Sequence, residues 1–358
     1  MKLLTKKYLK SFSDYDDHLF VFKEEDKQSG LFAYVAIHNN NLGPATGGTR
    51  VFNYLSEKDA ITDALRLSRA MTYKAALAGV GFGGGKGVIY LHKGEKKNKQ
   101  MMQRYAKFIN DINDTYCEYT TGEDVGLDQE DVELMTETSK FIVGSKGKAG
   151  DPSPFAALSC YYAIKESVNF LLKKKNLKGT KVAVKGVGKV GSVLVDFLVE
   201  EGCAVYISDI NRNAIDDVKR KYPNVISVEN YEISKLDVDI YSPCAMGGEF
   251  TNVNVNNLNC KIICGAANNQ LVSPNVGNSL KEIGIWYIPD YVTNCGGLIN
   301  VIDQLESSGY KKERVTKRII KVKKTVAEIL RKSLVENIPT NLIADSMAQE
   351  KIFAKHGK

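Results

Sequence analysis

The amino-acid sequence predicts an α/β protein built from two domains. Its 358 residues exceed the roughly 250–300 at which a single hydrophobic core usually stops growing. The second half alternates short apolar strands with helices, which favours a parallel sheet covered by helices on both faces. Between the halves lies a stretch rich in glycine and proline, GSKGKAGDPSP at 144–154. We therefore predict one domain at residues 1–145 and a second at 146–330.

The first domain mixes strand and helix signals. Residues 31–37 (LFAYVAI) form an apolar run of strand length. The segment from Ser56 to Asp59 has the spacing of a capping box, and the helix that follows would bury one face. That face carries Ala60, Ile61, Ala64, Leu65 and Ser68. The end of the chain, 331–358, has a helical composition, and we expect it to pack back on the first domain.

The second domain has a more regular pattern. Its predicted strands are residues 182–184, 205–207, 238–241, 262–264 and 285–288. Helical segments separate most of them, as in units of strand, crossover helix and parallel strand. The prediction for this domain is therefore a doubly wound parallel sheet.

Composition and charge exclude several classes of protein. An apolar content of 43% and a charged content of 25% are typical of globular chains and exclude a disordered or fibrous one. No apolar run approaches the ~18–20 residues of a membrane span. The basic first eight residues lack the apolar core of a signal peptide, so we predict a cytoplasmic protein without a membrane partner. The net charge of +7 comes partly from lysines at 173–181 and 311–332, which we interpret as solvated faces rather than a nucleic-acid surface.

The cysteines give no sign of a metal site or a disulfide framework. There are seven of them, an odd number, scattered without a C-x-x-C pair or a histidine at ligand spacing. They are typical of small buried side chains in a reducing compartment. We predict that the protein holds no metal ion.

A glycine motif opens the second domain. Gly186, Gly188 and Gly191 have the spacing G-x-G-x-x-G, directly after a predicted strand and at the start of a helix. In a dinucleotide site the first glycine permits a tight turn, the second lets the backbone approach the pyrophosphate, and the third lets helix and strand pack closely. Asp209, about 20 residues further on at the end of the next strand, would accept the ribose 2′-hydroxyl. An ordinary glycine-rich turn is the alternative, and the matching context disfavours it.

The same motif bears on the choice of cofactor. A carboxylate at Asp209 repels a 2′-phosphate, which favours NAD over NADP. Arg212 lies close enough to Asp209 in the sequence to weaken that preference, so NADP stays open as an alternative.

Four segments of the first domain are unusual. They are 43–50 (GPATGGTR), 71–74 (MTYK), 83–87 (GGGKG) and 121–126 (TGEDVG). The third resembles a phosphate loop but fails the Walker pattern, because Val80 replaces its first glycine and Gly87 its serine or threonine. We interpret its glycines as backbone that comes close to a small ligand and delivers Lys86 into a cleft. Lys74 is a second cation for the same site, although a single lysine is usually a surface charge.

Together with 242–248 (SPCAMGG), 265–271 (GAANNQL) and 289–298 (PDYVTNCGGL), these motifs resemble the Glu/Leu/Phe/Val dehydrogenase family of NAD(P)-dependent L-amino acid dehydrogenases. They occur in matching order from about residue 43 to 305, and the chain is most similar to the leucine, phenylalanine and tryptophan dehydrogenase branch. The resemblance implies a substrate-binding and oligomerisation domain at 1–145, a Rossmann-like NAD-binding domain at 146–330 and a cleft between them. It also implies a homo-oligomer.

The resemblance implies a role for each matching residue. Lys74 would bind the substrate α-carboxylate, helped by backbone of Gly47 and Gly48 and by the Asn269 side chain. Lys86 would be the general base that activates water, with Asp124 as its partner near the substrate amino group. A nearby cation and a dry cleft favour the neutral amine that a base requires, whereas a carboxylate opposes it. The implied cofactor contacts are Gly186, Val187, Gly188, Lys189, Val190, Gly191, Asp209, Ile210, Cys244, Ala245, Ala267, Asn268 and Asn294.

The implied reaction is reversible oxidative deamination. A hydride leaves the α-carbon for the nicotinamide, water adds to the iminium, and the product collapses to a 2-oxo acid and ammonia. Thr46, Gly122, Leu298 and Val301 would line a mainly apolar side-chain pocket. Glutamate enzymes typically carry a lysine where this chain has Thr46, so glutamate is not expected. We predict leucine, valine or isoleucine first. Phenylalanine or tryptophan come next, because the small size of Thr46 and Gly122 would leave room for an aromatic side chain, although the bulk of Leu298 opposes this.

One position departs from the family pattern. Ala156 stands where a threonine usually helps to hold the nicotinamide carboxamide, and Ser153 or Ser159 would have to replace that contact. The departure keeps an alternative open, a catalytically silent NAD-binding homologue with a regulatory or scaffolding role. A hydroxy-acid dehydrogenase is disfavoured because it normally needs a histidine base. The four histidines, His18, His38, His92 and His356, all lie outside the motifs.

Overall fold

A computed structural model describes residues 1–145 and 149–354. The chain divides into two compact units. The first unit comprises Met1–Gly150, Gln304–Tyr310 and the residues from Gln349 onward, and the second comprises Asp151–Asp303 and Lys311–Ala348. This division differs from our expectation for 331–358, because only the part from Gln349 onward groups with the first unit.

The first unit contains a mixed eight-stranded sheet in the order β1-β2-β3-β6-β4-β7-β8, with β5 paired to β6. The strands β1 to β3 and β6 pair antiparallel, while β4, β5, β7 and β8 join in parallel. Their bounds are β1 (Lys2–Leu3), β2 (Phe20–Asp26), β3 (Leu31–Asn39), β4 (Ala45–Thr46), β5 (Thr49–Phe52), β6 (Gly83–Tyr90), β7 (Tyr119–Gly122) and β8 (Ile142–Val143).

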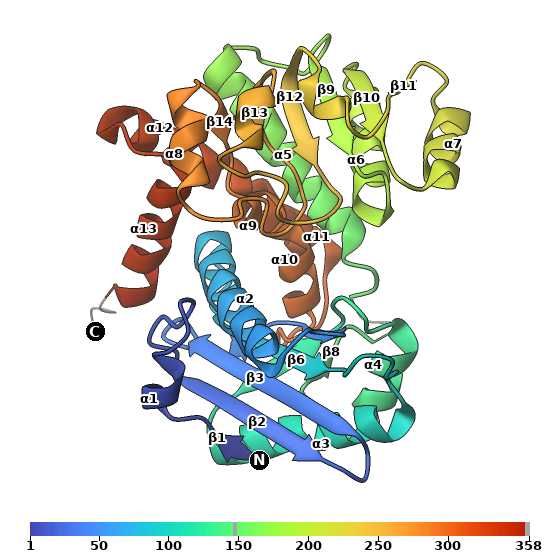
Figure 1. Ribbon diagram of the computed structural model, residues 1–358. Coiled ribbons are helices and arrows are strands. Elements are labelled where there is room, and N and C mark those ends of the chain that lie inside the picture. Colours follow the sequence, from blue (N-terminus) through green and yellow to red (C-terminus); the bar gives the residue numbers. More distant parts are fainter. Residues whose placement is uncertain (146–148, 355–358) are drawn as a thin grey trace. The chain divides into compact units, whose positions relative to one another are not determined.

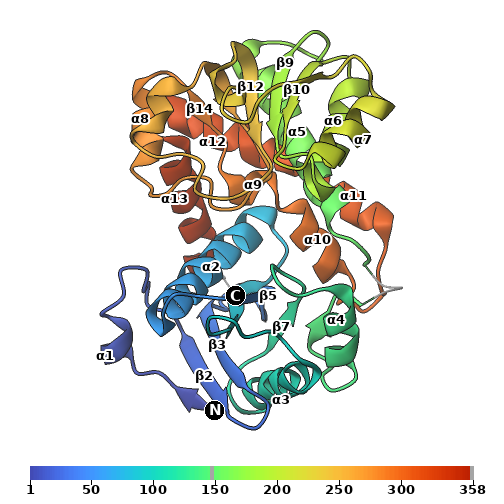
Figure 2. The ribbon, with the colours of Figure 1, turned by 45° about the vertical axis from the view of Figure 1, so that its right-hand side comes forward.

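Helices cover both faces of this sheet, as Figures 1 and 2 show. One face packs against α2 (Glu57–Ala78) and the short α1 (Lys6–Leu9), the other against α3 (Lys99–Thr115) and α4 (Gln129–Thr136). The Ser56 side chain accepts a hydrogen bond from the Asp59 N–H and caps α2 as predicted. The five residues assigned to the buried face of α2 are all buried. The predicted strand at 31–37 is confirmed as β3.

The second unit contains a six-stranded, fully parallel sheet in the order β11-β10-β9-β12-β13-β14. Numbered along the chain this order is 3-2-1-4-5-6, so the predicted doubly wound, Rossmann-like sheet is confirmed. The strands are β9 (Lys181–Lys185), β10 (Ala204–Ser208), β11 (Ile226–Ser227), β12 (Val238–Pro243), β13 (Cys260–Ile263) and β14 (Trp286–Tyr287). The two-residue β11 was not predicted, because so short a strand leaves no periodic signal.

The helices of the second unit complete the fold (Figure 2). The two 3₁₀ turns Ile233–Lys235 and Asn254–Asn257 and helix α8 (Val276–Glu282) share one core with the sheet. Helix α5 (Ser153–Leu172) packs with α6 (Lys189–Glu200), α10 (Gly296–Asp303), α11 (Lys312–Ile320) and α12 (Val322–Glu336). The remaining helices are α7 (Arg212–Lys221), α9 (Asp290–Thr293) and α13 (Thr340–Phe353).

Asp303 joins α10 to α11. Its carboxylate is fully buried and accepts hydrogen bonds from Arg314 at 2.6 and 2.8 Å and from the Lys311 N–H at 2.8 Å. Arg318 adds a contact at 3.3 Å. A buried charge is tolerated only when it is paired in this way, so the lysine- and arginine-rich stretch at 311–332 is partly structural.

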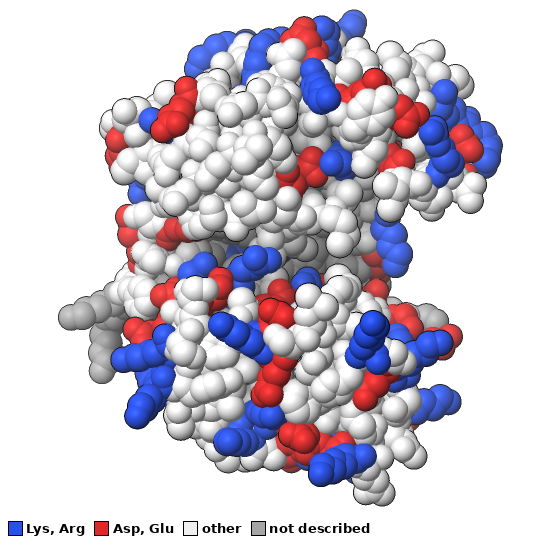
Figure 3. Space-filling view, in the orientation of Figure 1, with Lys and Arg blue, Asp and Glu red and all other residues white. Residues whose placement is uncertain are grey.

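The surface shows lysine and arginine mixed with acidic side chains, and basic side chains gather over α7 (Figure 3). Over residues 1–145 and 149–354, every helix is too short or too polar to cross a membrane. The same residues contain no group of three or more histidine, cysteine, aspartate or glutamate side chains arranged to hold a metal ion.

Candidate active site

Lys86 lies in the middle of β6, a strand whose eight residues are all buried. The strand pairs with β3 on one side, where Lys86 faces Ala36, and with β4 and β5 on the other. Only 5% of Lys86 is exposed. Because β6 is paired along both edges, the position of this lysine is fixed by the sheet rather than by a loop.

The glycines beside Lys86 are explained by the packing of the protein itself. A Cβ at Gly84 would lie 2.2 Å from the backbone nitrogen of Thr72 on α2, and a Cβ at Gly85 would lie 2.6 Å from the ring of Tyr119. Neither approach is possible for real atoms. This corrects our interpretation of the glycines as backbone left bare for a small ligand, because a helix and a tyrosine occupy the space.

The Lys86 ammonium belongs to a cluster of four charged groups. Lys86 Nζ donates to Asp124 Oδ2 at 2.6 Å, and Arg50 Nε donates to the same oxygen at 3.3 Å. Arg50 also donates to Asp63 at 2.9 Å, and the Tyr54 hydroxyl donates to Asp63 at 2.6 Å. Two cations thus share two carboxylates. Lys86 and Asp124 were predicted as partners, and the structure brings them into direct contact.

The environment of Asp124 keeps its carboxyl group ionised. Burial raises the pKa of Asp124, but the charges of Lys86 and Arg50 and hydrogen bonds from Lys86 and the Val125 N–H outweigh burial. The pKa of Asp124 therefore lies below its ordinary value. At neutral pH the group is a hydrogen-bond acceptor, suited to a cationic amino group.

Arg50 and Asp63 were missed by the sequence analysis. Arg50 closes the segment GPATGGTR on β5, and Asp63 lies on α2. A chemical argument could have pointed to Arg50. Asp124 was expected in a buried site with one lysine, and a buried carboxylate stays charged more easily when a second cation is near.

The other predicted substrate residues of the first unit lie on the same elements. Lys74 is half-buried on α2, the helix that packs against β6. Gly47 and Gly48 connect β4 to β5; a Cβ at Gly47 would lie 1.8 Å from the Gly85 carbonyl oxygen, and one at Gly48 would lie 2.7 Å from that of Glu123. Close backbone packing alone therefore demands both glycines.

The two pocket positions of this unit lie at the ends of short parallel strands. Thr46 is buried on β4, and its hydroxyl accepts a hydrogen bond from Thr120 at 3.1 Å. Gly122 pairs with Val143, and a Cβ on Gly122 would lie 2.4 Å from the Val143 carbonyl oxygen. We had taken the small size of Gly122 as a sign of a deep pocket. The structure gives a different reason, since strand pairing leaves no room for a side chain.

In the second unit, the predicted glycine loop connects β9 to α6. Gly186 has a φ of +92°, which glycine adopts readily, and a Cβ at Gly191 would lie 1.9 Å from the Gly186 carbonyl oxygen. A Cβ at Gly188 would meet nothing within 4 Å, so the backbone there is open to a ligand. Gly188 also begins α6 without a side-chain cap, which leaves backbone N–H groups of its first turn for an anion. Lys189 and Val190 follow in that turn, with Lys189 exposed.

Asp209 follows β10 and is tied to the glycine loop. Its Oδ2 accepts from the Val187 N–H at 2.8 Å and its Oδ1 from the Asn211 N–H at 2.8 Å. These bonds fix the carboxylate and leave it lone pairs for a ligand hydroxyl. The next residue, Ile210, is 90% exposed.

The loop after β12 meets the glycine loop where the strand order reverses. The Cys244 N–H donates to the Lys185 carbonyl oxygen at 2.7 Å, and a Cβ on Gly186 would lie 2.7 Å from the Ala245 nitrogen. The crevice at such a reversal is where doubly wound sheets bind ligands.

Asn294, at the end of α9, adds an unpaired acceptor beside the loop after β13. Asn294 Nδ2 donates to Asn268 Oδ1 at 2.8 Å and to the Ala266 carbonyl at 3.1 Å, while its own buried Oδ1 has no partner within the described residues. A buried acceptor without a donor costs about 1–3 kcal/mol, so this atom fits a ligand that carries an N–H group. Ala267 lies in the same loop and donates its N–H to the Pro243 carbonyl. Asn269 adopts a φ of +53°.

Position 156 lies at the start of α5 and is half-buried. Ser159 is fully buried, and its hydroxyl donates to the carbonyls of Ala156 and Thr293 and accepts from the Gly296 N–H. This hydroxyl is therefore engaged in joining α5 to α9 and α10. Of the two serines considered as replacements for the usual threonine, Ser153 therefore remains. It is half-buried at the first position of α5.

The other two predicted pocket residues are on α10. Leu298 and Val301 are three residues apart and half-buried, while Ile299 and Ile302 are buried in the second unit. Residues three apart on a helix lie on one face, so α10 presents an apolar face that is only partly covered.

Comparison with known proteins identifies the family of the chain. Two family profiles match the chain: "Glu/Leu/Phe/Val dehydrogenase, dimerisation domain" over residues 18–141 and "Glutamate/Leucine/Phenylalanine/Valine dehydrogenase" over residues 207–356. A leucine dehydrogenase of Geobacillus stearothermophilus is 39% identical over 349 residues, covering 97% of this chain and 92% of that protein. A valine dehydrogenase of Streptomyces virginiae is 37% identical, covering 95% of each.

A solved structure shows the same fold. The crystal structure of L-tryptophan dehydrogenase from Nostoc punctiforme superposes with a TM-score of 0.81 at 37% identity, covering 94% of this chain and 96% of that one. Relatives that match over nearly their whole length carry both units. This chain belongs to the Glu/Leu/Phe/Val dehydrogenase family of amino acid dehydrogenases.

Proposed function

We propose that the protein catalyses the reversible NAD-dependent oxidative deamination of an apolar L-amino acid to the 2-oxo acid and ammonia. Leucine, valine and isoleucine are the first candidates, phenylalanine and tryptophan the next. The observation that carries the proposal is the buried contact of Lys86 with Asp124 at 2.6 Å, in a chain whose relatives are named leucine and valine dehydrogenases.

Lys86 is the general base in this proposal, and Asp124 controls its charge. The Asp124 carboxylate holds the Lys86 ammonium and also faces the substrate amino group. When a cationic substrate amino group hydrogen-bonds to Asp124, it competes with Lys86 for the carboxylate, which favours loss of the Lys86 proton. The neutral Nζ then takes a proton from the water that attacks the iminium carbon. Arg50 keeps Asp124 ionised throughout, since it contacts Asp124 at 3.3 Å.

Lys74 binds the α-carboxylate of the substrate, with backbone of Gly47 and Gly48 and the side chain of Asn269. The first three are positioned by α2 and by the β4–β5 connection, elements that pack on β6 beside Lys86. A carboxylate held in this way places the α-carbon at a fixed distance from the base.

The nicotinamide cofactor binds along the glycine loop of the second unit, and when bound it accepts the hydride from the α-carbon. Gly188 and the first turn of α6 take the pyrophosphate, and Asp209 takes the adenosine ribose. NAD is favoured over NADP because Asp209 would face the 2′-phosphate, while Arg212 is engaged with Glu229 at 3.0 Å. The unpaired Oδ1 of Asn294 accepts from the carboxamide.

The side-chain pocket suits apolar substrates. Thr46 is neutral and its hydroxyl is already engaged by Thr120, so a distal substrate carboxylate would find no charge partner there. An unpaired buried charge costs several kcal/mol, which disfavours glutamate. Leu298 and Val301 supply apolar contact. Differences of one methylene in such a pocket discriminate by only about 1–3 kcal/mol, so several substrates are expected.

We further propose a homo-oligomer assembled through the first unit, in a cytoplasmic setting. The profile that matches residues 18–141 is described as a dimerisation domain, which supports assembly through this part of the chain.

The proposal is tested by following NADH at 340 nm, near pH 10, with purified protein, NAD and each of the twenty L-amino acids. We expect turnover with leucine, valine or isoleucine, or with phenylalanine or tryptophan. Any hit is repeated with NADP, where a lower kcat/KM is expected. Turnover confined to glutamate would contradict the assignment of the pocket.

If none of the twenty amino acids gives NADH and calorimetry still shows NAD binding, the alternative of a catalytically silent NAD-binding homologue is favoured. Two observations support this alternative: Ala156 has no hydroxyl, and the hydroxyl of Ser159 is already hydrogen-bonded within the protein. In that case Ala156→Thr is the variant to make, and recovery of turnover would identify the missing hydroxyl as the cause.

A further inference from the structure

A cavity of about 250 Å³ lies at the far edge of the second unit's sheet, beside β14. Helix α8, the start of β14, the end of α12 and the start of α13 enclose it, and these elements lie side by side in Figures 1 and 2. Strands β12 and β13 separate β14 from β9, whose carboxyl end carries the glycine loop. The cavity is therefore distinct from the proposed cofactor site, and none of its lining residues has a role in the proposed reaction.

The walls of the cavity are largely apolar. Ile285, Trp286, Leu334 and Pro339 contribute aromatic and aliphatic surface. Trp286 is half-buried and is the single tryptophan of the chain. Leu334 is 55% exposed and lies at the entrance, so the cavity is open to solvent on that side.

The hydroxyl groups in the lining are already used. The Ser333 hydroxyl donates to the Ile338 carbonyl at 2.6 Å, and the Thr340 hydroxyl donates to the carbonyl of Tyr287. Both bonds tie the connection between α12 and α13 to the rest of the unit. They fix the shape of the cavity and leave few polar groups for a ligand.

Lys281 is the one cation in the lining. Its Nζ donates to Asn337 Oδ1 at 2.6 Å, and among the described residues no carboxylate forms an ion pair with it. An ammonium group has three N–H donors, so two are left for a ligand. Asn337 ends α12 with a φ of +56°, a conformation that asparagine tolerates, and this conformation holds its amide beside the lysine. The lining contains no aspartate or glutamate.

We propose that this cavity binds a small apolar monocarboxylate, with the carboxylate on Lys281 and the hydrocarbon part against Trp286 and Leu334. The volume equals about eight water molecules at ~30 Å³ each, which suits a compact acid with a branched or aromatic tail. Free amino acids bind more weakly than the corresponding acids, because the lining offers no carboxylate to their ammonium group. Uncharged analogues of the same shape lose the contact with Lys281.

Trp286 provides a direct reporter, since all tryptophan emission of the protein comes from this cavity wall. The full-length protein is titrated with 4-methylpentanoate, with 4-methylpentanamide and with leucine, and each titration is repeated by calorimetry. We expect a saturable change of emission with the acid and at least tenfold weaker binding of the amide and of leucine. Equal affinities for acid and amide, or no response to the acid by either method, would overturn the proposal.

Variants separate this cavity from every other site that accepts an acid. Lys281→Met removes the cation, and Leu334→Glu places a negative charge at the entrance on an exposed side chain. Both are expected to weaken the emission response to 4-methylpentanoate at least tenfold while turnover of amino acids is unchanged. Lys178→Met, at an exposed lysine outside the cavity, is the matched control and should bind as the unmodified protein does. If Lys281→Met and Lys178→Met behave alike, the assignment of Lys281 is wrong.

Discussion

The two candidate sites of this protein consist of different kinds of chemical group, charged side chains in one and backbone groups in the other. Around Lys86 in the first unit, four charged side chains come from strands β5 and β6, helix α2 and the loop after β7, and each is stabilised by an opposite charge. Around Gly186 in the second unit, the site consists of one short loop, backbone N–H groups and the space that a missing side chain leaves. One site depends on charge balance and the other on volume.

That difference decides how each site responds to change. A charge removed from the Lys86 cluster disturbs the balance of buried charges: loss of Asp124 takes from Lys86 its carboxylate partner, whereas loss of Lys86 leaves Asp124 with Arg50. A methyl group added to the glycine loop acts through sterics, and its effect depends on whether the added atom meets protein or open space. The following predictions test that distinction, beginning with the largest expected effect.

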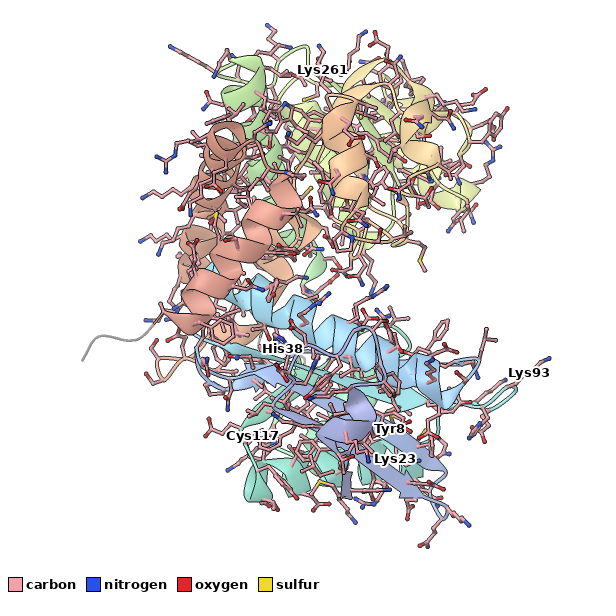
Figure 4. All side chains as sticks on the ribbon, turned by 60° about the vertical axis from the view of Figure 1, so that its left-hand side comes forward. Tyr8, Lys23, His38, Lys93, Cys117 and Lys261 are labelled. Atoms are coloured by element: carbon pink, nitrogen blue, oxygen red, sulfur yellow. The ribbon has the colours of Figure 1, made fainter. Side chains whose placement is uncertain are left out.

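Removal of the Lys86 ammonium should have the largest effect on turnover. For Lys86→Ala we expect kcat to fall by about 10²–10⁴-fold, the contribution typical of a positioned general base. NAD affinity, measured by calorimetry, should change little, because the proposed cofactor residues belong to the other unit. Lys93→Ala is the control, since Lys93 lies in the exposed loop after β6 and points away from the sheet (Figure 4). Near-normal turnover of Lys86→Ala would remove the lysine from the mechanism.

The first unit should also be the pH-sensitive one, because His18, His38 and His92 lie in it, whereas residues 151–303 and 311–348 of the second unit contain no histidine. Burial, with the nearby charge of His38, lowers the pKa of His18 from 6.5 to about 4. His18 donates through Nε2 to the Leu65 carbonyl and accepts through Nδ1 from the Asp16 N–H, so the folded state favours its neutral form. The unfolded chain binds the proton more readily. Folding stability should therefore fall as the pH drops from 6.5 to 4, by up to about 3 kcal/mol.

Denaturant unfolding at several pH values checks this. His18→Gln should flatten the slope between pH 6.5 and 4 relative to the unmodified protein, whereas His92→Gln, at an exposed histidine, should leave the slope as it was. Parallel slopes for the unmodified protein and His18→Gln would assign the acid sensitivity to the carboxylates instead. Figure 4 shows His38 beneath α2, where its Nδ1 lies 2.9 Å from the Thr72 hydroxyl and its Nε2 3.4 Å from Asp16.

Two alanines in the glycine loop should separate folding from binding. In Gly191→Ala the new Cβ meets the Gly186 carbonyl oxygen at 1.9 Å, and we expect a loss of about 1–3 kcal/mol in the free energy of unfolding. In Gly188→Ala the new Cβ meets no protein atom within 4 Å, so stability should be retained while NAD binds about tenfold more weakly. Denaturation and calorimetry on both variants test this. A Gly188→Ala protein with unchanged NAD affinity would show that the backbone there does not approach the cofactor.

The smallest expected effect concerns cofactor choice. Asp209→Asn removes the negative charge and keeps an acceptor oxygen for one of the two backbone N–H groups that Asp209 binds. The ratio of kcat/KM with NADP to that with NAD should rise about tenfold, or ~1.4 kcal/mol. Arg212→Gln should move the same ratio little or in the opposite direction. An unchanged ratio in Asp209→Asn would show that charge at this position does not select the cofactor.

The same contrast explains what the sequence could predict. The glycine loop is contiguous, so strand, turn, helix and acidic residue are legible at fixed spacings along 30 residues. In the Lys86 cluster, by contrast, Lys86 is separated from Asp124 by 38 positions in the sequence and Arg50 by 74. Only the resemblance to a known family paired Lys86 with Asp124. Arg50 went unassigned because nothing local distinguishes an arginine that binds a buried carboxylate from one on the surface.

The glycines of the first unit were the clearest misinterpretation. Sequence patterns show that a side chain is absent but not what fills its place. At Gly84, Gly85 and Gly122 the neighbour is protein, whereas at Gly188 it is open space. The expectation for residues 331–358 agrees with the division only from Gln349 onward, because helical composition does not specify the partner of a helix, and Lys311–Ala348 group with the second unit.

Strand β6 also limits how this protein can be redesigned. Four of its first five positions have no room for even one methyl group, so a randomised library that includes 83, 84, 85 or 87 would consist mostly of clones that do not fold. Diversity is better placed at Thr46 and at Val301, where side chains already exist and neighbours can adjust. Lys86, the proposed general base, is thus carried by a strand with little room for substitution, and new substrates have to be accommodated around it.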